Sequence, residues 1–267
     1  MTRDKNDLLK MANNPDFIPG IYNYCDRWCE RCPFMLRCMV YAMEKEDFPS
    51  QQSRDIKNKE FWQKIEQSLV LGSDLLRDMA KARGIELPSV LPEEVARERR
   101  KNREEAEHTA IAQEARRYST VTTEWFHAHK HMFTMKGNML TREVELGIKE
   151  PELTAVTISE AVEVIRWYQD QIRVKLMRAL HGGHQEEELD DDDELENFPK
   201  DSDGSAKVSL IGIDRSIGAW SQLRENLEDE SGSVLNILAD LYALRMKVEK
   251  RFPGARSFVR PGFDQEI

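Results

Sequence analysis

The chain has 267 residues, enough for one large domain or two smaller ones. Hydrophobic residues make up 40% of it and charged residues 33%, and the net charge is −10, a balance typical of surface-rich helical bundles. The first residues hold no apolar signal core, and no apolar run approaches the roughly 20 residues that a membrane helix needs. We therefore expect a cytoplasmic protein without a membrane span.

Most of the negative charge lies in one short run. Residues 186–196 (EEELDDDDELE) hold nine acidic residues and no basic one, so the rest of the chain is nearly neutral. Because the chain lacks an overall positive charge, nucleic acid is not an expected partner. We interpret the run as a solvated tether, which a protein with a basic face could bind.

The first segment, residues 1–50, contains every cysteine of the chain within fourteen residues: Cys25, Cys29, Cys32 and Cys38. In a reducing compartment, clustered cysteines are more often metal ligands than disulfides. The sequence therefore predicts an N-terminal metal-binding loop. A short helix over residues 39–46 is expected to follow it.

The spacing of the four cysteines favours an iron–sulfur cluster. Zinc ribbons supply two short pairs separated by a dozen or more residues, whereas these intervals are three, two and five residues. One compact loop can reach the four iron corners of a 4Fe-4S cubane, and the Cys32-Pro33 step matches ferredoxin ligands. Structural zinc, or free thiols, are the alternatives.

The residues between the cysteines would form the surroundings of such a cluster. Arginines at positions 27, 31 and 37 would favour its reduced form, unless they are simply solvated surface residues. Apolar side chains would exclude water from it. These expected neighbours are Arg27, Trp28, Arg31, Phe34, Met35, Leu36 and Arg37.

The run from Cys29 to Cys38 (CERCPFMLRC) resembles the cluster-binding element of iron–sulfur exonucleases and is similar to the auxiliary-cluster domains of radical-SAM enzymes. No strand-borne nuclease core follows it, so the resemblance implies a cluster and no nuclease activity. The Cys25–Cys29–Cys32 spacing also resembles the primary radical-SAM motif. We reject that interpretation, because Arg31 replaces the usual aromatic residue, Cys38 is available as a fourth ligand, and no barrel pattern follows.

Downstream, apolar residues recur at helical spacing. We expect a helix over residues 57–83 with Gly84 as its cap, and a long helix over 92–136 with a weak point at Thr120–Thr123. A third helix should run from Thr157 or Ser159 to about Leu180 and end at Gly182-Gly183. Two more should carry residues 210–227 and 235–248, separated by Ser231–Ser233.

These elements predict a mostly α fold, an antiparallel bundle of four or five long helices with the N-terminal cysteine loop. The expected segments are 1–50 for the metal site, 51–183 and 206–252 for the two parts of the bundle, 184–205 for an acidic disordered linker, and 253–267 for a tail. The aromatic residues on helical faces are expected in the core. They are Trp62, Trp125, Trp167, Tyr168, Trp220 and Tyr242.

A second metal site is an alternative. Glu-x-x-His, a di-iron ligand pattern of helical bundles, occurs twice, at Glu105/His108 and at Glu124/His127, and Glu163 could add a carboxylate. On one straight helix, however, His108 and Glu124 would lie about 24 Å apart. Exposed, salt-bridging side chains are the plainer interpretation.

Three functions remain open at this point. The first is a four-Cys 4Fe-4S protein that serves electron transfer, redox sensing or structural stabilisation, with a redox or protein partner that the sequence does not identify. The second is a di-iron oxidative enzyme fed with electrons by the cluster. The third is a zinc-stapled interaction module.

Overall fold

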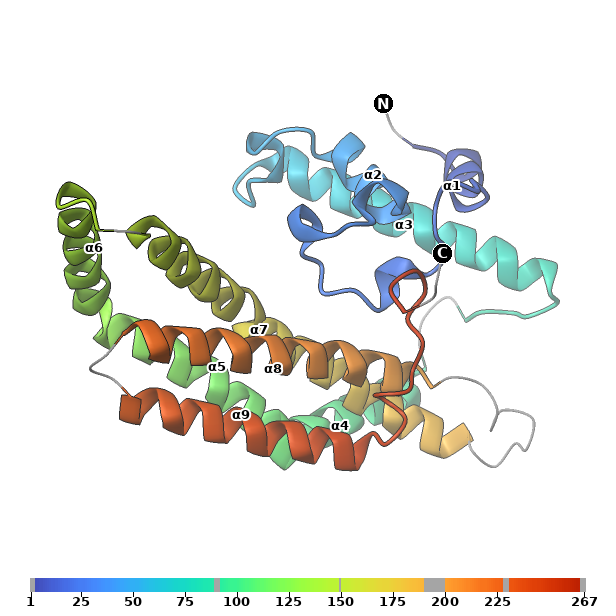
Figure 1. Cartoon of the computed structure of the whole chain (residues 1–267). Coiled ribbons are helices and arrows are strands. Elements are labelled where there is room, and N and C mark those ends of the chain that lie inside the picture. The colour runs from blue at the N-terminus through green and yellow to red at the C-terminus, as the bar shows by residue number, and fades with distance from the viewer. Residues whose placement is uncertain (1–2, 89–91, 149, 190–199, 228–230, 265–267) are drawn as a thin grey trace. The chain divides into compact units, whose positions relative to one another are not determined.

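The computed structural model describes residues 3–88, 92–148, 150–189, 200–227 and 231–264. Within these ranges the chain forms nine α-helices, four short 3-10 helices and no strand, which confirms the mostly α fold (Figure 1). The α-helices are α1 (Lys5–Ala12), α2 (Met39–Asp47), α3 (Lys59–Ala82), α4 (Glu93–His108), α5 (Ala110–Ala128), α6 (Lys130–Glu145), α7 (Pro151–Leu189), α8 (Asp201–Asn226) and α9 (Ser231–Arg251). Among the described residues, no helix is long and apolar enough to cross a membrane.

The chain divides into two compact units, and the division differs from the expected one. The cysteine unit comprises Met1–Glu98 and Val259–Ile267, and the bundle unit comprises Arg99–Phe258. Residues 51–98, expected in the bundle, therefore belong with the cysteines, and the tail joins them from Val259 onward. Helical periodicity identifies an apolar face but does not say which core that face joins.

Four helices of the bundle unit, α5, α7, α8 and α9, each pack against two of the others. In Figure 1, α5, α8 and α9 run side by side. Two side-chain contacts show that α5 and α9 are antiparallel. Arg117 of α5 pairs with Asp240 of α9, and nearer the other end of α5 the indole of Trp125 donates to Ser233. The expected antiparallel bundle of long helices is therefore present, and α6 packs on α7 outside the four.

The bundle core contains three of the aromatic residues expected there, Trp125, Tyr168 and Trp220, whereas Trp167 is only partly buried. Trp220 and Tyr168 are fully buried, Trp125 is 4% exposed, and the ring of Trp125 meets that of Trp220 edge-on at 4.9 Å. The indole nitrogen of Trp220 donates to the hydroxyl of Tyr118, 3.2 Å away. Burial raises the pKa of this Tyr118 hydroxyl, although the neighbouring polar groups of Ser216, Trp220 and Thr122 oppose the shift.

The long helix expected over residues 92–136 breaks at other places than the expected one. The hydroxyls of Thr120 and Thr123 donate to backbone carbonyls one turn earlier, and α5 continues unbroken through them. The breaks lie at Thr109, whose side chain caps α5 by accepting from the amide of Ala112, and at His129. A threonine hydroxyl can bond a carbonyl inside a helix or cap the start of a helix. The β-branched threonines therefore did not show by themselves where the helix would break.

The paired glycines at 182–183 do not end the third helix, because α7 runs on to Leu189. Glycine weakens a helix by about 1 kcal/mol relative to alanine, but here both glycines face neighbours. A Cβ on Gly182 would lie 3.6 Å from the amide nitrogen of Ser202, and one on Gly183 would lie 3.7 Å from the ring of Phe252. Packing against these segments offsets the weakness.

The expected disordered linker 184–205 is therefore helical at both described ends, in α7 to Leu189 and in α8 from Asp201. Its middle, residues 190–199, lies outside the described residues. Ser231–Ser233, expected between the last two helices, instead begins α9.

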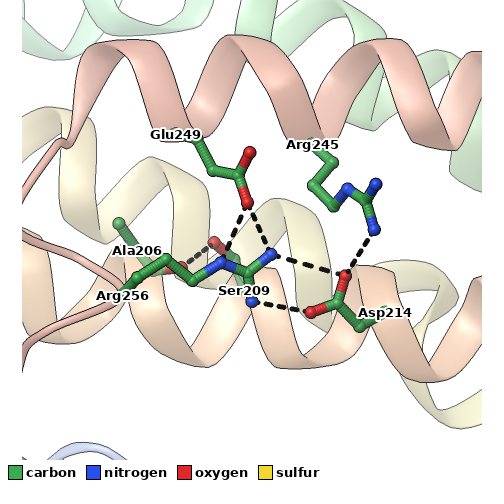
Figure 2. Close-up of polar contacts among 6 residues, drawn as sticks. All are labelled: Ala206, Ser209, Asp214, Arg245, Glu249 and Arg256. Atoms are coloured by element: carbon green, nitrogen blue, oxygen red, sulfur yellow. Dashed lines mark hydrogen bonds and ion pairs between the residues drawn. The ribbon is translucent and has the colours of Figure 1, made fainter.

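The residues after α9 are tied to α8 by ion pairs (Figure 2). The guanidinium of Arg256 donates to Asp214 at 2.7 Å and to Glu249 at 2.6 Å, and Arg245 reaches the same Asp214 carboxylate at 3.3 Å. Close backbone approach adds to this link, because a Cβ on Gly254 would lie only 2.3 Å from a carboxylate oxygen of Asp203. The end of the bundle is thus held in place before the chain returns to the cysteine unit.

In the cysteine unit, α3 matches its expected bounds, and Gly84 adopts the left-handed conformation of a C-terminal cap (φ +74°). The helix buries none of its side chains, however. Trp62, expected in the core, is 56% exposed, and Tyr242 on α9 of the bundle is 54% exposed. On α3 the exposed side also carries Leu69, Val70, Leu76 and Met79.

Candidate metal centre

The four cysteines lie on short turns rather than on long helices. Cys25 follows the 3-10 helix Ile21–Asn23, and Cys29 begins the next, Cys29–Arg31, whose turn is closed by the amide of Cys32 donating to the carbonyl of Cys29. Cys38 follows the third, Met35–Arg37, and precedes α2. Tight turns of this kind reverse the chain often enough for four cysteines, close in sequence, to border the same space.

All four cysteines line a single pocket, the cysteine pocket. Its volume is only about 20 Å³, room for about one water molecule. Each thiol is partly buried, and the Cys25 thiol donates to the carbonyl of Tyr22 at 3.5 Å. The four cysteines thus border one small, partly open space.

Arg27 shapes the loop between the first two cysteines. Its φ of +58° is in the left-handed region, which non-glycine residues rarely occupy. Next to it, the side chain of Asp26 accepts from the amide of Trp28 at 3.2 Å, which closes a local turn. This reversal allows Cys25 and Cys29, four positions apart, to face the same pocket.

Of the expected surroundings, only some residues reach the pocket. Arg27, Trp28 and Met35 line it. The guanidinium of Arg31 lies over the ring of Trp28 at 4.4 Å, and Arg37 donates to the carbonyl of Asp16, and neither arginine lines the pocket. Leu36, expected to exclude water, is 78% exposed.

Three aromatic residues of the pocket were missed in the sequence: Tyr22, Tyr41 and Phe263. Tyr41 lies three residues after Cys38 at the start of α2, a spacing that could have revealed it. Phe263 lies at the other end of the chain, and no local pattern pointed to it. Its ring packs edge-on against Phe34 at 5.3 Å, so Phe34 supports the pocket wall from behind.

The electrostatics of the pocket favour protonated thiols while no metal is bound. Burial, with smaller contributions from Cys25, Glu44, Cys38 and Glu30, raises the pKa of Cys29 to about 11. Burial also raises the pKa of Cys32, although the amide of Phe34 donates to it and opposes the shift. Binding of a metal by thiolates would therefore release protons.

The structure does not assemble the candidate second metal site. Glu105 pairs with Lys101 at 3.6 Å, and His108 bonds the carbonyl of Glu104, both on the exposed face of α4. Glu124 and His127 are exposed on α5, and Glu163 is exposed on α7. These positions match salt-bridging and solvated side chains.

In the described part of the chain, no group of three or more His, Cys, Asp or Glu side chains is arranged to hold a metal ion. The cysteines are gathered around a pocket rather than around one point. Comparison with family models, with curated proteins and with solved structures gives no match.

Proposed function

We propose that the chain is an iron–sulfur protein and that Cys25, Cys29, Cys32 and Cys38 bind one 4Fe-4S cluster. The observation that carries this proposal is that all the cysteines of the chain line the same pocket. Four thiolates are the donor set that such a cluster requires, one for each iron. With every iron bound to protein, the cluster would supply one-electron transfer or structural support.

The residues around the thiols suit that cofactor. Trp28, Tyr41 and Phe263 give the pocket aromatic walls, which exclude water and so protect a cluster from hydrolysis. Arg31, stacked on Trp28, holds a positive charge beside the site. Positive charge near a cluster held by four thiolates favours its reduced form.

Counting metal and sulfide tests the proposal. The full chain, purified without oxygen, is expected to be brown and to contain about four irons and about four sulfides. Cys32→Ser should lower the iron content to well under half, while Leu36→Ser, in the same loop but on an exposed side chain, should leave it unchanged. Circular dichroism of both variants shows whether the helices have remained folded.

Two outcomes would contradict the proposal. A colourless protein with one zinc per chain would identify a zinc-stapled module instead. Equal iron content in Cys32→Ser and in the unmodified chain would show that the iron lies elsewhere.

A further inference from the structure

A second site lies in the bundle unit, in an open groove between α4 and α7. The groove has a volume of about 830 Å³, and a neighbouring hollow of about 350 Å³ on α4, α5 and α7 shares Glu107 and Arg173 with it. Together they form what we call the arginine groove. Its six arginines are Arg99, Arg100, Arg103, Arg116, Arg173 and Arg178.

Most of these arginines lack a counter-charge within the described chain. Arg103 pairs with Glu107 at 3.6 Å, and Arg178 pairs with Asp201 at 2.7 Å. The other four make no ion pair with any described residue. In the same unit Arg117, Arg245 and Arg256 all have acidic partners.

This gathering is unfavourable for the chain alone. Guanidinium groups keep their charge at every ordinary pH, so like charges drawn from three helices repel one another. The chain has 49 acidic residues against 39 basic ones, so acidic partners are not in short supply. An anion from outside the described chain would remove the repulsion.

The chemistry of the groove selects the kind of anion. Guanidinium groups match phosphate oxygens with two parallel hydrogen bonds, and here they come from both walls. None of the described residues that line the groove is Trp, Tyr or Phe, so it lacks the large aromatic platform on which successive bases of a single strand stack; its described rings are the imidazoles of His108 and His181. Glu104 and Glu105 on α4 would also repel a long strand leaving the groove.

We propose that the arginine groove binds a compact polyphosphate, such as the phosphate chain of a nucleoside triphosphate. The phosphates would lie between Arg99 and Arg100 on the α4 wall and Arg173 on the α7 wall. This site is separate from the cysteine pocket and does not depend on the cluster.

Isothermal titration of the full chain with inorganic triphosphate, at about 0.15 M ionic strength, tests the proposal. Binding is expected, and Arg100→Gln and Arg173→Gln, one from each wall, should each weaken it about tenfold, the effect of losing one charge-assisted hydrogen bond. Arg224→Gln is the matched control. Arg224 is an exposed arginine of α8 outside the groove that makes no ion pair with a described residue, and its variant should bind normally.

Two further ligands identify what the groove recognises. A nucleoside triphosphate that binds as well as inorganic triphosphate would show recognition of the phosphate chain alone, and tighter binding would show that the nucleoside contributes. Three results would overturn the proposal: no binding of triphosphate, an equal loss in Arg224→Gln, or tighter binding of a single-stranded oligonucleotide that the same groove variants abolish.

Discussion

Two glycines on one helix, Gly212 and Gly218 of α8, have opposite surroundings. A Cβ on Gly212 would lie 2.8 Å from the ring of Tyr168, closer than real Cβ contacts, and that ring is fully buried. A Cβ on Gly218 would meet nothing within 4 Å. The absence of a side chain is therefore essential for packing at one position and only a loss of helix propensity at the other.

Alanine at these two positions should change stability in opposite directions. We expect Gly212→Ala to lower the free energy of unfolding by roughly 1–3 kcal/mol, the usual effect of overpacking a core. Gly218→Ala should raise it by roughly 0.5–1 kcal/mol, because alanine favours the helix. Urea unfolding of both variants checks this, and a stabilised Gly212→Ala would show that α7 and α8 do not pack as described.

Among the elements, α3 and α8 differ most in burial. None of the side chains of α3 is buried, whereas α8 buries thirteen of its residues. Helices in proteins gain most of their stability from packing, and isolated helices are marginal in water. The 24 residues of α3 thus depend on capping and on contacts near their ends, such as the pair between Lys5 and Asp78.

Hydrogen exchange should reveal this difference directly. Amides of α3 are expected to exchange at least about 100-fold faster than those of α8, because opening α3 exposes little apolar surface. Mass spectrometry of peptides covering residues 59–82 and 201–226 measures both rates in one sample. Equal protection would mean that another surface covers the exposed face of α3 in solution.

The helices themselves could be located from the sequence, but their surroundings could not. Apolar periodicity correctly indicated α3, α8 and α9, because spacing along one face is a local property. It placed Trp62 in a core where the structure leaves it exposed, because burial depends on distant segments. Gly182 and Gly183 were wrongly predicted to end a helix for the same reason. The residues that pack against them, Ser202 and Phe252, lie far along the chain.

In the candidate metal centre, too, the sequence indicates local groupings but not contacts with distant segments. The sequence could group the cysteines because all four come from one short segment, whose turns fold around a common pocket. Phe263 closes that pocket from more than 200 positions away, a contact that only the folded chain creates.

At the scale of the whole molecule, segments from both ends of the sequence form the cysteine unit. Gly262 has a φ of +76° and lies close to Ile18 and Ile21, where a Cβ would come within 3.0–3.2 Å of their side chains. Phe263 follows at once and joins the pocket wall. The tail is therefore part of the architecture of the site.

Phe263→Ala should open the cysteine pocket without disturbing the bundle. Alkylation of the metal-free thiols is expected to become roughly tenfold faster, which corresponds to about 1.4 kcal/mol of lost packing. Helical circular dichroism should change little. Val259→Ala, at a tail residue that is 54% exposed, is the control, and an equal acceleration there would show that the pocket wall is not responsible.

This arrangement also sets an order of events during protein synthesis. A ribosome makes Cys25 to Cys38 early, then every helix of the bundle, and only afterwards Phe263, so the thiols remain without one wall while the bundle is translated. A metal that must be delivered to accessible thiols could reach them while the bundle is being translated. A nascent chain stalled before residue 263 would keep its cysteines accessible to delivery and to oxidants alike.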